Sequence, residues 1–241
     1  MNKLLRTLTL GCLLVSPAPA QEPAQPEKKP SRGRAAYFVY TSMPEGLENP
    51  VSVLSGTEIS QIVLSKLSPS DPVKIPADGI LRIVRKIPNQ EDPKKPAYMT
   101  LAQATVPESV TDAMVILMPI AKNPNGLLFQ AKVQDLAALK GGDTMFLNMT
   151  TLKIGIELGG AKIGVGPGQV NIHNPLGTAK TVSLPIKFSY YDASKEEWRL
   201  ITASTVALYS TRRELCIFNW DSRFGRVDYE SITFPLLESA P

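Results

Sequence analysis

Residues 152–165 read Leu-Lys-Ile-Gly-Ile-Glu-Leu-Gly-Gly-Ala-Lys-Ile-Gly-Val. Two β-prone runs flank the pair Gly159-Gly160, and glycine accepts the positive φ angles that a tight hairpin turn requires. This pattern is typical of a β-hairpin, so we expect antiparallel strands at 152–158 and 161–165.

Two further hairpins follow toward the C-terminus. Residues 182–191 and 198–209 flank the polar loop 192–197, and residues 214–220 and 227–234 flank the loop 221–226. Each run is rich in the β-branched and aromatic residues that strands favour. The second half of the chain is therefore predicted to be a meander of hairpins.

The chain before residue 152 is also read as short strands, which proline and glycine turns separate. One segment differs, because Val133, Leu136 and Leu139 are spaced by three residues and Gly141-Gly142 follows. This spacing predicts a short helical or 3₁₀ turn near 130–140. The expected strands lie at 36–41, 51–54, 60–64, 80–86, 98–106, 113–118, 144–148 and 170–172.

These elements predict an all-β protein, and the regular spacing of short strands favours a pair of immunoglobulin-like β-sandwiches. We place the first sandwich unit at 36–118 and the second at 120–237. A single larger sandwich is the alternative, because turn signals do not say which strands share a sheet.

The first residues predict export. Lys3 and Arg6 precede an apolar run that ends before Ala18-Pro19-Ala20, which is the order of regions in a secretory signal peptide. We expect a signal peptide at 1–20, a disordered, proline-rich linker at 21–35, and a periplasmic or extracellular location. Lipid attachment at Cys12 is a less favoured alternative. After Val15 no apolar run approaches spanning length, so no membrane span is expected.

Charge and cysteine content exclude several classes of protein. Without Lys3 and Arg6, the chain has 24 basic and 22 acidic residues, a formal charge of +2. This balance does not favour nucleic acid as a partner. Cys216 is then the one cysteine, so no disulfide within the chain is expected to stabilise the fold.

No catalytic, cofactor-binding or metal-ligating set emerges from the residue types. Cys216 lies in an apolar strand and His173 in a loop-like segment, which disfavours a cysteine hydrolase. One histidine is too few for a blue-copper site, and no Gly-x-Ser-x-Gly elbow indicates a serine hydrolase. Gly164–Gly168 contains proline and precedes a β-prone segment, so it predicts a turn rather than a phosphate-binding loop. We therefore expect no cofactor and no metal.

Aromatic residues gather late in the chain and suggest a binding surface. Phe218 and Trp220 share one strand face and are expected in the core, whereas the neighbours Tyr190 and Tyr191 must point to opposite faces. Tyr191, Phe224 and Arg226 lie beside turns, and Tyr, Phe and Arg are favoured at interfaces. These three residues form the candidate binding surface.

The segment 142–150, with Phe146-Leu147-Asn148, then Gly159-Gly160 and Pro167-Gly168, resembles a pattern in uncharacterised secreted bacterial β-sandwich proteins. It is also faintly similar to the periplasmic accessory proteins of alginate O-acetylation. The resemblance covers about thirty residues of turn chemistry, so it supports a fold and transfers no site. It implies a non-catalytic role in the cell envelope.

Together these observations favour a non-enzymatic, exported binding or structural module of the bacterial cell envelope. Its expected partner is an envelope protein or a polysaccharide. The alternative is a carboxylate-dependent glycan hydrolase or lyase, because Asp192, Glu196 and Glu197 cluster in one loop. Carboxylates in a hairpin loop with Lys195 are more often a solvated turn.

Overall fold

The computed structural model describes residues 33–89, 92, 95–120 and 126–236. This part of the chain is all-β, with 16 strands in four sheets and no helix. It accordingly contains no helix of a length and apolarity suited to crossing a membrane. The predicted signal peptide and residues 21–32 of the linker lie outside the described residues.

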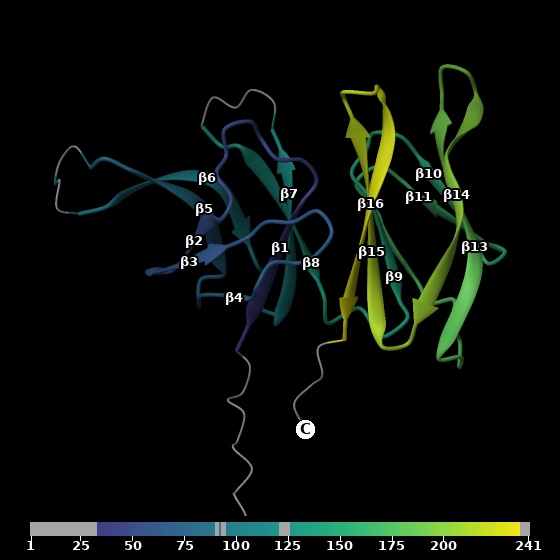
Figure 1. Ribbon diagram of the computed structural model, residues 1–241, viewed down its shortest axis with the longest axis horizontal. Helices are drawn as coiled ribbons and strands as arrows, with labels where there is room; N and C mark the ends of the chain where they lie inside the picture. Colours follow the sequence, from purple (N-terminus) through teal and green to yellow (C-terminus); the bar gives the residue numbers. More distant parts are fainter. Residues whose placement is uncertain (1–32, 90–91, 93–94, 121–125, 237–241) are drawn as a thin grey trace, which may run out of the picture. The chain divides into compact units, whose positions relative to one another are not determined.

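The first eight strands form two four-stranded sheets (Figure 1). Sheet A has the order β4-β1-β7-β8, and sheet B has the order β3-β2-β5-β6. The bounds are β1 Ala35–Tyr40, β2 Val51–Ser55, β3 Glu58–Ile62, β4 Val73–Lys74, β5 Ile80–Ile87, β6 Ala97–Thr105, β7 Asp112–Pro119 and β8 Phe129–Asp135.

The last eight strands form two more sheets. Sheet C has the order β12-β9-β15-β16, and sheet D has the order β11-β10-β13-β14. The bounds are β9 Thr144–Asn148, β10 Ile154–Leu158, β11 Ala161–Val165, β12 Val170–His173, β13 Thr181–Asp192, β14 Glu197–Tyr209, β15 Arg212–Asp221 and β16 Arg226–Pro235.

The two halves repeat one topology. Adding eight to each strand number of sheets A and B gives the order of sheets C and D. The only parallel pairs, β1 with β7 and β9 with β15, are equivalent among the described strands. An irregularity in register recurs as well, between Ile83 and Val84 of β5 and between Phe188 and Ser189 of β13. The chain therefore builds the same eight-stranded β-sandwich twice.

Three hydrophobic clusters hold the sheets together. The first joins sheets B and A, the second joins A and C, and the third joins C and D. Phe38 of β1 belongs to the first cluster, whereas Tyr37 and Val39 belong to the second. Sheets A and C are buried on both faces, which explains why β7 and β9 read as nearly continuous apolar runs.

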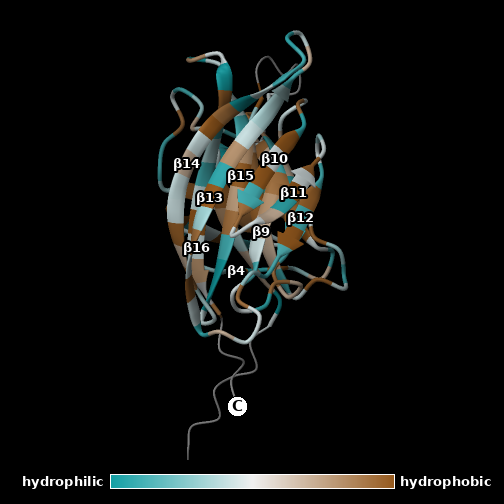
Figure 2. Ribbon diagram, turned by 90° about the vertical axis from the view of Figure 1, so that its right-hand side faces the viewer, coloured by the Kyte–Doolittle hydropathy of each residue, from teal (hydrophilic) through white to brown (hydrophobic). Residues whose placement is uncertain are grey.

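Sheet D buries only one face. Ile154, Ile156 and Leu158 of β10 are buried in the third cluster, while Gly155 and Glu157 between them point outward. Figure 2 looks onto this sheet and shows hydrophobic and more hydrophilic residues alternating along β13. The alternation in the sequence of this strand results from one inward and one outward face.

The helical or 3₁₀ turn predicted near 130–140 is wrong for residues 130–135 and is reduced to a single turn at 136–139. Residues 129–135 form strand β8, which pairs with β7, and only a hydrogen-bonded turn follows, where Leu139 N donates to Leu136 O at 3.1 Å. Two of the three spaced residues, Leu136 and Leu139, are buried in the second cluster. Their spacing reflects a single turn between the two halves. The residues before that turn form a strand because they pair with β7.

The strand pairing departs from two further expectations. The second half contains three hairpins, but it is not a meander, because β9 pairs with β12 and, in parallel, with β15. The proposed boundary at 118–120 falls between β7 and β8, which pair in sheet A. The architecture consists of two β-sandwich units. The finer assignment of these units as immunoglobulin-like stays a prediction.

Candidate functional site

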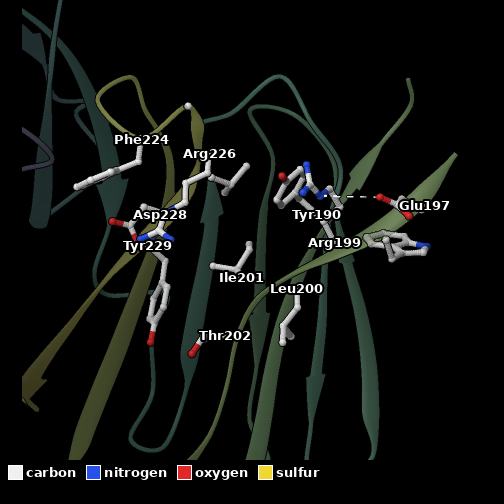
Figure 3. A pocket seen from close by; sticks show the side chains of 13 residues that line it. Tyr190, Glu197, Arg199, Leu200, Ile201, Thr202, Phe224, Arg226, Asp228 and Tyr229 are labelled. Atoms are coloured by element: carbon white, nitrogen blue, oxygen red, sulfur yellow. Dashed lines mark hydrogen bonds and ion pairs between the residues drawn. The ribbon is translucent and has the colours of Figure 1, made fainter. Parts of the chain in front are cut away.

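A hollow of about 730 Å³ lies where edge strands β14 and β16 approach one another across the second sandwich. Figure 3 shows Phe224, Arg226 and Tyr229 on one side and Arg199 and Glu197 on the other, with Ile201 between them. The lining residues are Tyr190, Glu197, Trp198, Arg199, Leu200, Ile201, Thr202, Phe224, Gly225, Arg226, Val227, Asp228 and Tyr229.

The hollow lies between edge strands β14 and β16, and this junction between the two strands is called the seam. In the first half the equivalent seam, between β6 and β8, is closed. Near the equivalent seam between β6 and β8, Leu128 N donates to Leu101 O at 2.7 Å. Leu101 is the extra residue at the register shift of β6, and Ile201 is its counterpart in β14. Leu101 is 1% exposed, whereas Ile201 is only half-buried. Within the described residues no backbone hydrogen bond joins β14 to β16, so this seam stays open.

The hairpin between β15 and β16 projects Phe224 into solvent. Asp221 Oδ1 accepts the backbone N–H of Arg223 at 2.8 Å and that of Phe224 at 3.3 Å, which fixes the turn. The Phe224 ring is 62% exposed, with the guanidinium carbons of Arg223 and Arg226 at 4.9 and 5.4 Å from its centroid. Cation–π attraction therefore holds two cations beside one exposed ring.

The opposite wall carries charges that are already paired. Arg199 contacts Asp192 at 3.7 Å and Glu197 at 3.9 Å. The Ser194 hydroxyl donates to Asp192 at 2.6 Å and holds the pKa of that carboxyl below its ordinary value, with Arg199 adding to the effect. Because Arg199 and Glu197 are about half exposed, this wall offers solvated charged groups to a ligand.

Two of the three predicted surface residues meet in this hollow. Phe224 and Arg226 line it, but Tyr191 does not. Tyr190, the inward neighbour, is 8% exposed and lines the hollow from β13. Tyr191 lies on the outer face of sheet D, where its ring centroid is 5.5 Å from that of Trp198. The prediction that the two tyrosines point to opposite faces is confirmed.

Sequence reasoning gave other aromatic residues the wrong weight. Phe218 is fully buried, as expected, but Trp220 is 52% exposed and was expected in the core. Trp220 lies at the end of β15, beyond the buried stretch of that strand. Trp198 was not singled out, although it is 53% exposed and lines this hollow. The sequence did contain a signal for Trp198. The residue directly follows a charged loop and lies opposite Tyr191 across the predicted hairpin.

A smaller hollow of about 200 Å³ continues along the same seam, with Tyr229 lining both. Here burial raises the pKa of the Cys216 thiol to about 12, and its sulfur lies 3.6 Å from the Ser231 hydroxyl oxygen. Burial also raises the pKa of Glu214, which accepts a hydrogen bond from Thr233 at 2.6 Å. A thiol of this pKa is protonated at neutral pH and is no nucleophile.

The remaining chemistry-bearing side chains do not converge. His173 lies in β12, at the opposite edge of sheet C from β16. No group of three or more His, Cys, Asp and Glu residues that could hold a metal occurs in the described part of the chain.

Comparisons with known proteins give no family. No family model matches the chain, and no curated protein matches it.

Proposed function

We propose that the protein is an exported, non-enzymatic binding module of the bacterial cell envelope, recognising an envelope protein or a polysaccharide through the seam between β14 and β16. One observation carries the proposal. The first sandwich closes its equivalent seam with a backbone hydrogen bond, and the second leaves a hollow of about 730 Å³ there.

The composition of the hollow suits recognition. Phe224 offers an exposed ring, and Tyr190 and Tyr229 offer phenol groups beside it. Rings with neighbouring hydrogen-bonding groups bind sugars and peptide side chains alike. Arg226 has no ion pair within 4.0 Å among the described residues and can pair with a ligand.

The carboxylates in the hollow do not favour the hydrolase or lyase alternative. Glu197 lies 3.9 Å from Arg199 in a solvated ion pair, and Asp228 accepts the backbone N–H of Tyr229 at 2.9 Å. A glycosidase needs one carboxyl group whose pKa is raised so that it can donate a proton, facing a second carboxylate. The carboxyl groups whose pKa burial raises, Glu214 and Glu230, lie outside this hollow.

The test is affinity capture from envelope extract with residues 21–241, in parallel with a Phe224→Ala/Arg226→Ala variant. We expect a protein or carbohydrate that the wild-type chain retains and the variant loses. A ligand retained equally by both would contradict the use of this seam. Shortening of added polysaccharide, abolished by Glu197→Gln or Asp228→Asn, would instead establish the hydrolase or lyase.

A further inference from the structure

A trough of about 490 Å³ runs across the outer face of sheet D, separate from the seam and sharing only Trp198 with it. Its floor is made of residues with little or no side chain. Gly155 of β10 lies between Gly164 of β11 and Ser189 of β13 in the register of the sheet. Backbone therefore forms the open floor at Gly164, beside the indole that covers Gly155, and a flat ligand can come close to it there.

Trp198 forms one wall of this trough. A Cβ atom on Gly155 would lie 2.8 Å from Cζ3 of Trp198, so the indole lies directly against the Gly155 backbone. The tilted Tyr191 ring supports the indole from the side, with centroids 5.5 Å apart and planes at 60°. Because the indole remains 53% exposed, it presents a positioned ring to solvent.

The other lining side chains are mainly cationic. Lys153, Lys162 and Lys187 face a single carboxylate, Glu157, which gives the lining a formal charge of +2. Lys187 pairs with Glu157 at 3.2 Å, and both are about half exposed, so the pair is solvated and exchanges readily. An anionic ligand would find the ammonium groups of Lys153 and Lys162 beside the ring.

Covering a strand glycine with an aromatic ring is a known structural device, and it accounts for Gly155. It does not account for Gly164. A Cβ atom there would meet nothing within 4 Å, and no positive φ demands glycine. Glycine in a strand interior weakens the strand, so any β-branched residue at 164 would favour the fold. The missing side chain keeps the floor of the trough clear.

We propose that this trough binds an acidic polysaccharide, with Trp198 packing against a sugar face and the lysines pairing with uronate carboxylates. The inference rests on the proposed binding role and adds a ligand class to it. A glycan fits better than a protein partner because lysine is depleted at protein interfaces, while a sugar ring stacks on an exposed indole. The net positive lining favours an acidic glycan over a neutral one.

The experiment measures binding of oligogalacturonate, with a neutral cello-oligosaccharide as comparison, by titration calorimetry on residues 21–241. The wild-type chain should bind the acidic probe and not the neutral one, and binding should weaken as salt is raised. Gly164→Thr places a side chain on the floor of the trough, and its Cβ atom meets nothing within 4 Å, so it should weaken binding about tenfold or more while leaving the chain folded. Ser183→Thr, on the same face at the other end of β13, is the matched control and should bind like the wild type.

Two kinds of result would overturn the inference. One is no binding of oligogalacturonate by the wild-type chain, or equal binding of the neutral probe. The other is loss of binding in Lys162→Glu without loss in Gly164→Thr, because general surface charge would then suffice. Neither result touches the seam, since capture that depends on Phe224 and Arg226 is measured separately.

Discussion

The seam between β6 and β8 is closed by the bond from Leu128 N to Leu101 O, whereas the equivalent seam between β14 and β16 is a hollow lined by aromatic and charged side chains. Sheet order and the position of the register irregularity are the same in both halves. The two sandwiches therefore differ at an edge rather than in their fold.

The connection between the last two strands produces this difference. In the first half β7 ends at Pro119 and β8 begins at Phe129, and Leu128 directly before β8 reaches β6. In the second half only residues 222–225 join β15 to β16, and the turn points Phe224 outward. A short, polar hairpin cannot cover the edge of β14, and an uncovered edge is where a binding site can form.

The largest effect is expected in the cores. Phe188→Ala should lower the free energy of unfolding by about 3–5 kcal/mol, because the ring is 2% exposed and packs edge-on against three other aromatic rings. Urea denaturation followed by circular dichroism checks this value. Because the second cluster contains residues of both halves, Phe188→Ala and Phe38→Ala should shift one common transition. Two transitions, each moved by one variant, would show that the sandwiches unfold independently.

A matched pair tests the seams themselves. Leu101→Ala should cost about 2–5 kcal/mol of unfolding free energy, since Leu101 is 1% exposed. Ile201→Ala at the equivalent position should cost less than about 2 kcal/mol, because the side chain is only half-buried. Urea denaturation of each variant beside the wild type measures both losses. Equal losses would mean that the second seam is closed in solution.

A smaller effect is expected from Glu214. Burial raises its pKa above the ordinary 4.5, so the folded state binds more protons than the unfolded state between these two values. The free energy of unfolding should therefore fall as pH rises through that window. Glu214→Gln should make the melting temperature less dependent on pH there, as measured by calorimetry. Some dependence of the same sign should persist, since burial also raises the pKa of Glu230. An unchanged pH profile would argue against burial of Glu214.

The smallest effect belongs to Phe224. Phe224→Ala should change the free energy of unfolding by no more than about 0.5 kcal/mol, because the ring is 62% exposed. Thermal unfolding of the variant beside the wild type provides the measurement. A larger loss would mean that the ring stabilises the hairpin, and Phe224 variants would then be unsuitable as tests of binding.

Local pattern located most strands because strand alternation and turn chemistry act over few residues. The predicted strands at 144–148 and 161–165 coincide with β9 and β11, and the Gly159-Gly160 hairpin is confirmed, with positive φ at both glycines. The two missed strands, β4 and β8, are a two-residue strand and one whose spacing imitates a helical turn. Neither has a period that distinguishes it without its partner strand.

The candidate site was only partly predictable. Phe224 and Arg226 could be named from the sequence because they flank a turn, which places side chains at the surface. Arg199 and Tyr229 could not, because their meeting depends on edge strands from two different sheets. The alternation that placed Tyr190 and Tyr191 on opposite faces did not reveal which face borders a hollow.

The sequence by itself determined that the described part of this chain is all-β, where its hairpins turn, and that one histidine is too few for a blue-copper site. Only the tertiary structure decided that one topology occurs twice, that β9 runs parallel to β15, and that one seam is closed and the other open. The physical reason is the separation along the chain of the residues involved. A turn or an alternating strand is specified by adjacent residues. The pairing of Gly155 with Gly164 under Trp198, or the bond from Leu128 to Leu101, depends on segments brought together by burial of the shared cores.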